Sequence, residues 1–206
     1  MLFFVRFNEI LSLPEGPPRT AAIAAWVQGL FSEEGQIPVL VGGAAVEILT
    51  GGAYTTGDLD FVGSVPTSVR RKLKANGFKR TGRHWIHEPA EIFLEFPSEA
   101  LGVEEEAVRR KAFGYEIVLV SVEDLLVDRL GAWAHWKSGV DGANAFLLFR
   151  ICRDEIDHGR LVRRANQAGF KDALDSLRAF DTEWSASDPD SETLENWANS
   201  GPPENT

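Results

Sequence analysis

The chain has 206 residues, of which 44% are hydrophobic and 25% are charged, and its formal net charge is −10. This composition is typical of a globular protein and excludes collagen-like, coiled-coil and wholly disordered chains. Cys152 is the single cysteine, so the sequence allows neither an intrachain disulfide nor a metal site built from several cysteines. No apolar run reaches the roughly 20 residues of a membrane-spanning helix, and the first residues lack a signal-peptide pattern. We therefore expect a cytoplasmic protein that does not enter a membrane.

The acidic residues are unevenly distributed along the chain. Residues 181–206 hold seven Asp and Glu and no Lys or Arg, whereas residues 1–180 hold 24 acidic and 21 basic residues, a net charge of only −3. The last segment is also rich in Ser, Pro and Asn. This composition predicts a flexible acidic tail over 181–206.

A second charge pattern has the opposite sign. Residues 61–87 contain no acidic residue and seven basic ones: Arg70, Arg71, Lys72, Lys74, Lys79, Arg80 and Arg83. Such a run is typical of a surface that binds a polyanion. The alternative is a solvated basic helix face that acidic residues elsewhere in the fold balance.

Apolar periodicity, glycine and proline predict the elements of the first half of the chain. In order, they are a helix over 21–31, a strand over 37–41, a helix over 44–50, a strand over 58–62 and a helix over 67–74. The segment Pro14–Pro18 is expected to lie outside any helix because it holds three prolines, and Thr20 is expected to cap the first helix. Gly42 and Gly43 close the first strand, so this region is a strand, a glycine turn and a short helix.

Two apolar stretches on either side of residues 88–90 predict a β-hairpin. The later elements, in order, are the hairpin strands over 84–87 and 91–96, a strand over 115–120, and helices over 121–137, 141–157, 158–168 and 171–180. The expected domains are an N-terminal extension over 1–19, an α/β core over 20–120, a helical half over 121–180 and the acidic tail over 181–206. We expect the α+β class, with a small mixed sheet and flanking helices followed by the helical half.

The stretch from Gly42 to Asp60 carries the strongest chemical pattern. Gly42 and Gly43 let a ligand approach the backbone at a helix N-terminus, where unpaired N–H groups attract an anion such as phosphate. Asp58 and Asp60 alternate with Leu59 on the next strand, so their side chains share one face, with Cα atoms about 6.5–7 Å apart. Two carboxylates at this spacing suit a divalent cation such as Mg²⁺.

This pattern resembles the signature of the nucleotidyltransferase superfamily, which has a polymerase beta-like fold. Within the superfamily it is similar to the AbiEii-like and minimal nucleotidyltransferases, which are often toxins. The resemblance covers about residues 37–150. It implies that Asp58 and Asp60 hold one or two Mg²⁺ ions that bridge a nucleoside triphosphate (NTP), and that Gly42, Gly43 and Thr56 contact this nucleotide.

The resemblance also implies further site residues. A third carboxylate is expected on a following strand, and Glu95 fits this role; Glu91 is the alternative, because both share a face if the strand is regular. In the helical half, the relatives carry basic residues followed by aspartates, and the corresponding residues here are Arg129, Lys137 and Asp141. These three are expected to contribute to nucleotide binding.

Together these residues predict a magnesium-dependent nucleotidyltransferase that transfers a nucleoside monophosphate (NMP) from an NTP to a hydroxyl group. RNA, including tRNA, and proteins are candidate acceptors. The candidate RNA contacts are Arg70, Arg71, Lys74, Lys79, Arg80 and Arg83. The resemblance to this toxin group also implies an antitoxin protein as a candidate partner. The alternative is a catalytically silent relative that binds a nucleotide or another protein.

Overall fold

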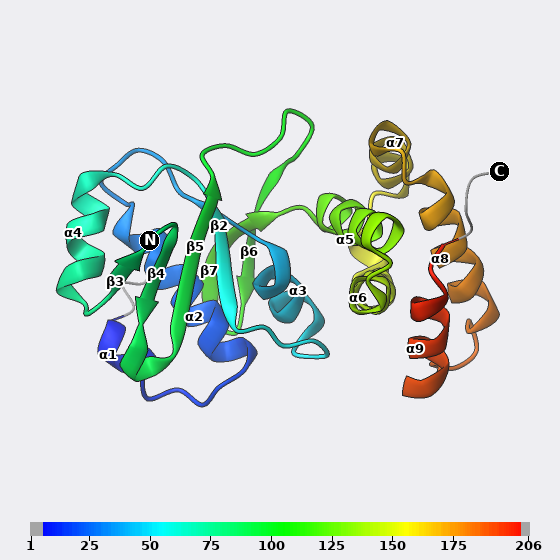
Figure 1. The fold of residues 1–206 in the computed structure, drawn as a ribbon, viewed down its shortest axis with the longest axis horizontal. Coiled ribbons are helices and arrows are strands. Elements are labelled where there is room, and N and C mark those ends of the chain that lie inside the picture. Colours follow the sequence, from blue (N-terminus) through cyan, green and yellow to red (C-terminus); the bar gives the residue numbers. More distant parts are fainter. Residues whose placement is uncertain (1–5, 203–206) are drawn as a thin grey trace. The chain divides into compact units, whose positions relative to one another are not determined.

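The computed structural model describes residues 6–202. The chain is divided between Ser121 and Val122 into two compact units. The first unit holds one mixed sheet with helices around it, and the described part of the second unit is helical (Figure 1). The expected α+β class is therefore confirmed.

A seven-stranded sheet forms the centre of the first unit, in the order β3-β4-β5-β2-β1-β7-β6 (Figure 1). Its strands are β1 (Val39–Val41), β2 (Asp58–Val62), β3 (Lys79–Thr81), β4 (His84–His87), β5 (Ile92–Ser98), β6 (Ala107–Ala112) and β7 (Tyr115–Val120). The pairs β1–β7 and β2–β5 are parallel, and the other neighbours are antiparallel. The expected strand over 58–62, the strand over 115–120 and the pairing of β4 with β5 are confirmed. β3 and β6 are additional strands that sequence analysis did not identify.

Four α-helices belong to the described part of the first unit: α1 (Phe7–Ile10), α2 (Pro17–Leu30), α3 (Gly42–Thr50) and α4 (Thr67–Ala75). A short 3₁₀ helix, η1 (Glu88–Ala90), connects β4 to β5. The helix α2 packs against β7 and α3, and its middle is buried on all sides, which its small alanine side chains permit.

The start of α2 differs from the expectation. The helix begins at Pro17 rather than at Ala21, so Thr20 lies within its first turns and is not its cap. Pro17 and Pro18 occupy the first helical positions, where a backbone N–H has no acceptor inside the helix and the proline ring meets no preceding turn.

Gln28 connects α2 to the sheet through both ends of its buried amide. Its Nε2 donates to the carbonyl oxygens of Pro38 at 2.9 Å and Val118 at 2.6 Å, and its Oε1 accepts from the N–H of Val118 at 2.9 Å. These bonds satisfy backbone groups where β1 and β7 lie side by side. They hold β1, and with it the glycine pair that follows, at a fixed position under α2.

The described part of the second unit contains the helices α5 (Val122–Trp136), α6 (Gly139–Ile151), α7 (His158–Ala168), α8 (Lys171–Glu183) and α9 (Ser191–Ser200), and the 3₁₀ helix η2 (Arg153–Glu155). Its core is aromatic. The ring of Trp197 stacks on Phe180 with 4.5 Å between centroids and lies 4.6 Å from the ring of Trp133. Trp133 Nε1 also donates to the carbonyl of Ala198 at 2.6 Å, so α9 is attached to α5 by packing and by a buried hydrogen bond.

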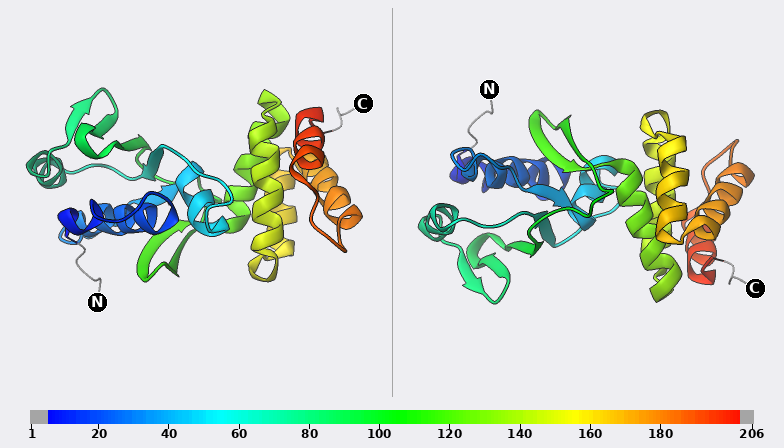
Figure 2. Two further views of the ribbon diagram at one scale, coloured as in Figure 1. Left: turned by 90° about the horizontal axis from the view of Figure 1, so that it is seen from below. Right: turned by 90° about the horizontal axis from the view of Figure 1, so that it is seen from above.

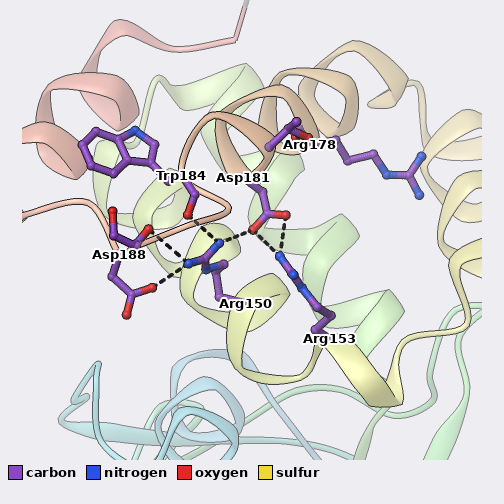
Figure 3. A network of polar contacts seen from close by, with 8 residues as sticks. Arg150, Arg153, Arg178, Asp181, Trp184 and Asp188 are labelled. Atoms are coloured by element: carbon purple, nitrogen blue, oxygen red, sulfur yellow. Dashed lines mark hydrogen bonds and ion pairs between the residues drawn. The ribbon is translucent and has the colours of Figure 1, made fainter.

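Three aspartates of residues 181–190 have partners in the second unit. Asp181 accepts from Arg150 at 3.1 Å and from Arg153 at 2.7 Å, and Arg150 also reaches Asp188 at 2.7 Å (Figure 3). The hydrogen bond from Arg150 to Asp188 raises the pKa of the guanidinium, although burial partly opposes this effect. Asp190 caps α9 by accepting from the N–H of Thr193 at 2.7 Å.

The prediction of a flexible tail from residue 181 is therefore wrong for the part that the structure describes. The helix α8 continues to Glu183, and α9 packs on the core through Trp197. Composition did not reveal this result, because three of the acidic side chains serve as a helix cap or as arginine partners, while Trp197 supplies the aromatic contact with the core.

Candidate functional site

Asp58 and Asp60 lie on β2, with the side chain of Asp58 exposed and that of Asp60 half-buried. The intervening Leu59 and the following Phe61 are buried. The alternation expected from the sequence is thus present, and both carboxylates extend from the same face of the strand.

Glu95 lies beside Asp60 in the sheet. The two residues are register partners on the parallel strands β2 and β5, so the three candidate carboxylates share one sheet face. The Glu95 side chain contacts two basic residues: Oε1 lies 2.6 Å from Arg83 Nε and Oε2 lies 3.2 Å from His84 Nδ1. Within residues 6–202, no three Asp, Glu, His or Cys side chains are grouped closely enough to hold one metal ion.

Glu91 does not fit the alternative role. It follows η1 in a left-handed conformation with φ of 50° and precedes the first residue of β5. It therefore lies outside the regular strand, and the expectation that Glu91 and Glu95 share a strand face is wrong. The tight turn from η1 into β5 is the physical reason.

Gly42 and Gly43 begin α3, two residues earlier than expected, and both lie in crowded surroundings. Gly42 has φ of +66°, and a Cβ atom built on it would lie 2.7 Å from Asp60 Oδ2. A Cβ atom on Gly43 would lie 2.9 Å from Thr56 Oγ1. Only glycine lets the N-terminus of α3, with its unpaired N–H groups, approach Asp60 and Thr56 this closely. The structure thus brings both glycines, Thr56 and Asp60 together.

Thr56 is also connected to a residue that sequence analysis missed. Its N–H donates to Glu47 Oε2 at 3.4 Å, and Thr20 Oγ1 donates to Glu47 Oε1 at 3.1 Å. Glu47 is only 2% exposed. Burial raises the pKa of its carboxyl, and the hydrogen bonds from Thr56 and Thr20 oppose this effect. A single glutamate inside the apolar helix sequence Ala44–Leu49 was the signal that could have identified it.

The basic residues of 61–87 lie on α4, β3 and the turn into β4, which are neighbours at one end of the first unit (Figure 2). We use the name basic surface for the exposed members Arg70, Arg71, Lys74, Lys79, Arg80 and Arg83. Lys72 is less exposed and pairs with Glu33 at 3.0 Å, and Lys79 pairs with Glu88 at 3.2 Å. Because Arg83 contacts Glu95, the basic surface adjoins the candidate carboxylates.

Arg129, Lys137 and Asp141, the other expected nucleotide contacts, belong to the second unit. Arg129 Nη1 lies 2.6 Å from Asp141 Oδ1, so these two side chains form an ion pair with each other. Lys137 follows the end of α5 in a left-handed conformation with φ of 52°. The structure therefore brings Arg129 and Asp141 together.

In the part of the chain that the structure describes, no helix combines the length and apolar character that a membrane span requires. Comparisons of the whole chain with protein-family models, with curated proteins and with solved structures find no match. Inferences about function therefore depend on the residues and their geometry.

Proposed function

We propose that the chain is a magnesium-dependent nucleotidyltransferase that transfers an NMP from an NTP to a hydroxyl acceptor. The observation that carries this proposal is the approach of Gly42, at the start of α3, to the Asp60 carboxylate. An anion-attracting helix terminus and a strand that carries two aspartates are thereby adjacent, which is the arrangement needed to hold a metal-bound polyphosphate.

The residues present fit a magnesium ion when the substrate supplies the remaining ligands. Mg²⁺ is commonly bound by one or two carboxylates together with phosphate oxygens and water. Asp58 and Asp60 offer two carboxylates on one face of β2. Glu95 is the third candidate, and it would have to exchange its ion pair with Arg83 for the metal.

In this proposal, the N–H groups of α3 hold and orient the triphosphate, and the two aspartates hold the metal. The bound cation would polarise the α-phosphate and stabilise the departing pyrophosphate. The acceptor oxygen forms a bond to the α-phosphorus, the bond to the pyrophosphate oxygen breaks, and the hydroxyl proton is released to solvent. Because Gly42 and Gly43 carry no side chains, the triphosphate can approach the backbone at the start of α3.

The direct test is incubation of the full chain with each α-labelled NTP, Mg²⁺ and either total cellular RNA or a cell lysate. We expect label on a macromolecule in the presence of Mg²⁺ and none when EDTA replaces it. No label with any of the four NTPs, in RNA or in protein, would contradict the transferase proposal.

A catalytically silent relative is the second candidate. It is favoured by the ion pair between Glu95 and Arg83, because this pair occupies the carboxylate that would complete the metal site. A silent relative, for example a domain held by an antitoxin-like partner, would bind NTP weakly or without dependence on Mg²⁺. Titration of NTP with and without Mg²⁺ distinguishes the two candidates.

The basic surface supports RNA as the acceptor. Arg71 and Lys74 are exposed on α4, and none of the ion pairs within residues 6–202 involves them. The surface reaches the candidate carboxylates through Arg83, so a bound RNA strand would have its end close to the site of transfer. A small acceptor would not need so extended a basic surface.

Replacement of Arg71 and Lys74 by glutamate is expected to weaken RNA binding and to reduce its dependence on salt. Each lost phosphate contact should reduce the slope of log affinity against log salt by about 0.7 for single-stranded RNA. Filter binding over a range of KCl concentrations measures this slope. The matched control is the replacement of Arg109 and Lys111 by glutamate, since these exposed residues lie on β6 at the opposite edge of the same sheet. Equal effects of both double variants would exclude the basic surface as the RNA site.

A further inference from the structure

A pocket of about 540 Å³ lies in the first unit, and Asp58, Asp60 and Glu95 are outside its lining. This volume is within the range of small-molecule sites. Ile23, Leu59 and Ile92, all buried, form its apolar floor. Polar groups come from α2 and α3, namely Arg19, Thr20 and Glu47, and from the loop that precedes β2. The pocket therefore combines apolar surface with a few convergent polar groups.

Glu47 is the unusual member of this lining. Its side chain is almost fully buried, yet its two hydrogen bonds come from neutral donors, Thr20 and Thr56. Within residues 6–202, no Lys, Arg or His forms an ion pair with it, whereas buried carboxylates in proteins are generally paired. The protein thus supplies hydrogen bonds to this carboxylate but no positive charge to balance it.

The other charged groups that face the pocket increase this imbalance. Glu15 and Glu91 are exposed at its edge, and Arg19 is the only basic residue among the described residues of the lining. Arg19 donates to the carbonyl of Ala90 at 2.9 Å and lies 3.7 Å from Glu15. Three carboxylates against one guanidinium make the pocket unfavourable for phosphate and favourable for a cation.

We propose that this pocket binds a small organic cation, whose amidinium or ammonium group pairs with the Glu47 carboxylate and whose body lies on the apolar floor. The ligand supplies the positive charge that the buried carboxylate lacks, and the pair forms where water is largely excluded. The pocket shares Thr56 with the proposed nucleotide site, but the binding of a cation to Glu47 is a property of its own and does not depend on the transfer reaction. The competing occupant is a neutral ligand with a carbonyl oxygen, because Arg19 Nε is buried without an acceptor within the described chain.

Benzamidine and benzamide distinguish these occupants, because they have nearly the same shape and differ in charge. Isothermal titration calorimetry of the full chain should give an affinity for benzamidine at least about tenfold higher than for benzamide. Glu47→Gln should remove this preference, and Glu116→Gln, at an exposed residue of β7 outside the pocket, should retain it. The benzamidine affinity should also rise with pH and then level off, since burial raises the pKa of Glu47 and the cation requires the ionised carboxylate.

The comparison of the two ligands on the unmodified chain needs no variant, so it stands even if Glu47→Gln fails to fold. No benzamidine binding, equal affinity for both ligands, or tighter binding of benzamide would overturn the proposal. A folded Glu47→Gln variant that keeps the full preference for benzamidine would also overturn it. None of these results bears on NMP transfer, which the labelling experiment tests separately.

Discussion

Replacement of Asp58 and Asp60 together by asparagine is expected to lower NMP transfer by roughly a thousandfold or more. Metal polarisation of a phosphoryl group contributes several kcal/mol to transition-state stabilisation, and about 1.4 kcal/mol corresponds to a factor of ten in rate. Asparagine has nearly the same shape as aspartate but no charge, so the double variant removes the metal and leaves the strand. The measurement is the initial rate of label incorporation at saturating NTP and Mg²⁺.

The folded state of the double variant must be preserved for this result to be informative. Asp58 is exposed and Asp60 is half-buried, and both extend from the same face of β2, so loss of their mutual repulsion should not lower the melting temperature strongly. Glu116→Gln is the matched control, because it removes one exposed carboxylate of the same sheet and should leave the rate unchanged. Transfer at the wild-type rate by a folded double variant would refute the assignment of these aspartates.

Asp124→Ala is expected to reduce the free energy of unfolding of the second unit by about 3–5 kcal/mol, the cost of removing one member of a buried ion pair. The Asp124 side chain is 1% exposed, and its two oxygens lie 2.6 Å from Arg160 Nη2 and 2.7 Å from Arg164 Nε. Both arginines belong to α7 and are mostly buried. Without the carboxylate, the two guanidinium groups would lose their shared partner in a region of low dielectric, although Arg160 would keep its contact with Glu123 of α5 at 3.6 Å.

Urea unfolding, followed by tryptophan fluorescence, measures this loss; Trp133 of α5 is fully buried in this unit. The control is Asp175→Ala, which removes an exposed carboxylate that pairs with Lys171 on α8. Such an exposed pair contributes about 0.5 kcal/mol or less. If Asp124→Ala and Asp175→Ala shift the transition equally, the contact between α5 and α7 does not depend on the buried carboxylate.

The amino-acid pattern determined the local elements on which the candidate site is built. The alternation in Asp58–Val62 identified β2 with its observed bounds and placed both aspartates on one face. The glycine pair identified the start of a helix after β1, although α3 begins at Gly42 itself. These features depend on neighbours within a few residues, so local periodicity and backbone freedom suffice to identify them.

Pairing between distant segments was decided by the tertiary structure alone. The neighbouring positions of Asp60 and Glu95 follow from the parallel pairing of β2 with β5, and the ion pair of Glu95 with Arg83 follows from the turn between β3 and β4. Burial of Glu47 results from the packing of α3 against α2. The position of α9 was also decided by the tertiary structure. Its acidic sequence predicted a flexible tail, whereas Trp197 stacks on Phe180 in the aromatic core. Composition averages over a segment and describes its tendency to be solvated. Packing depends instead on whether one large apolar side chain meets a complementary surface from elsewhere in the chain. No local pattern contains that information.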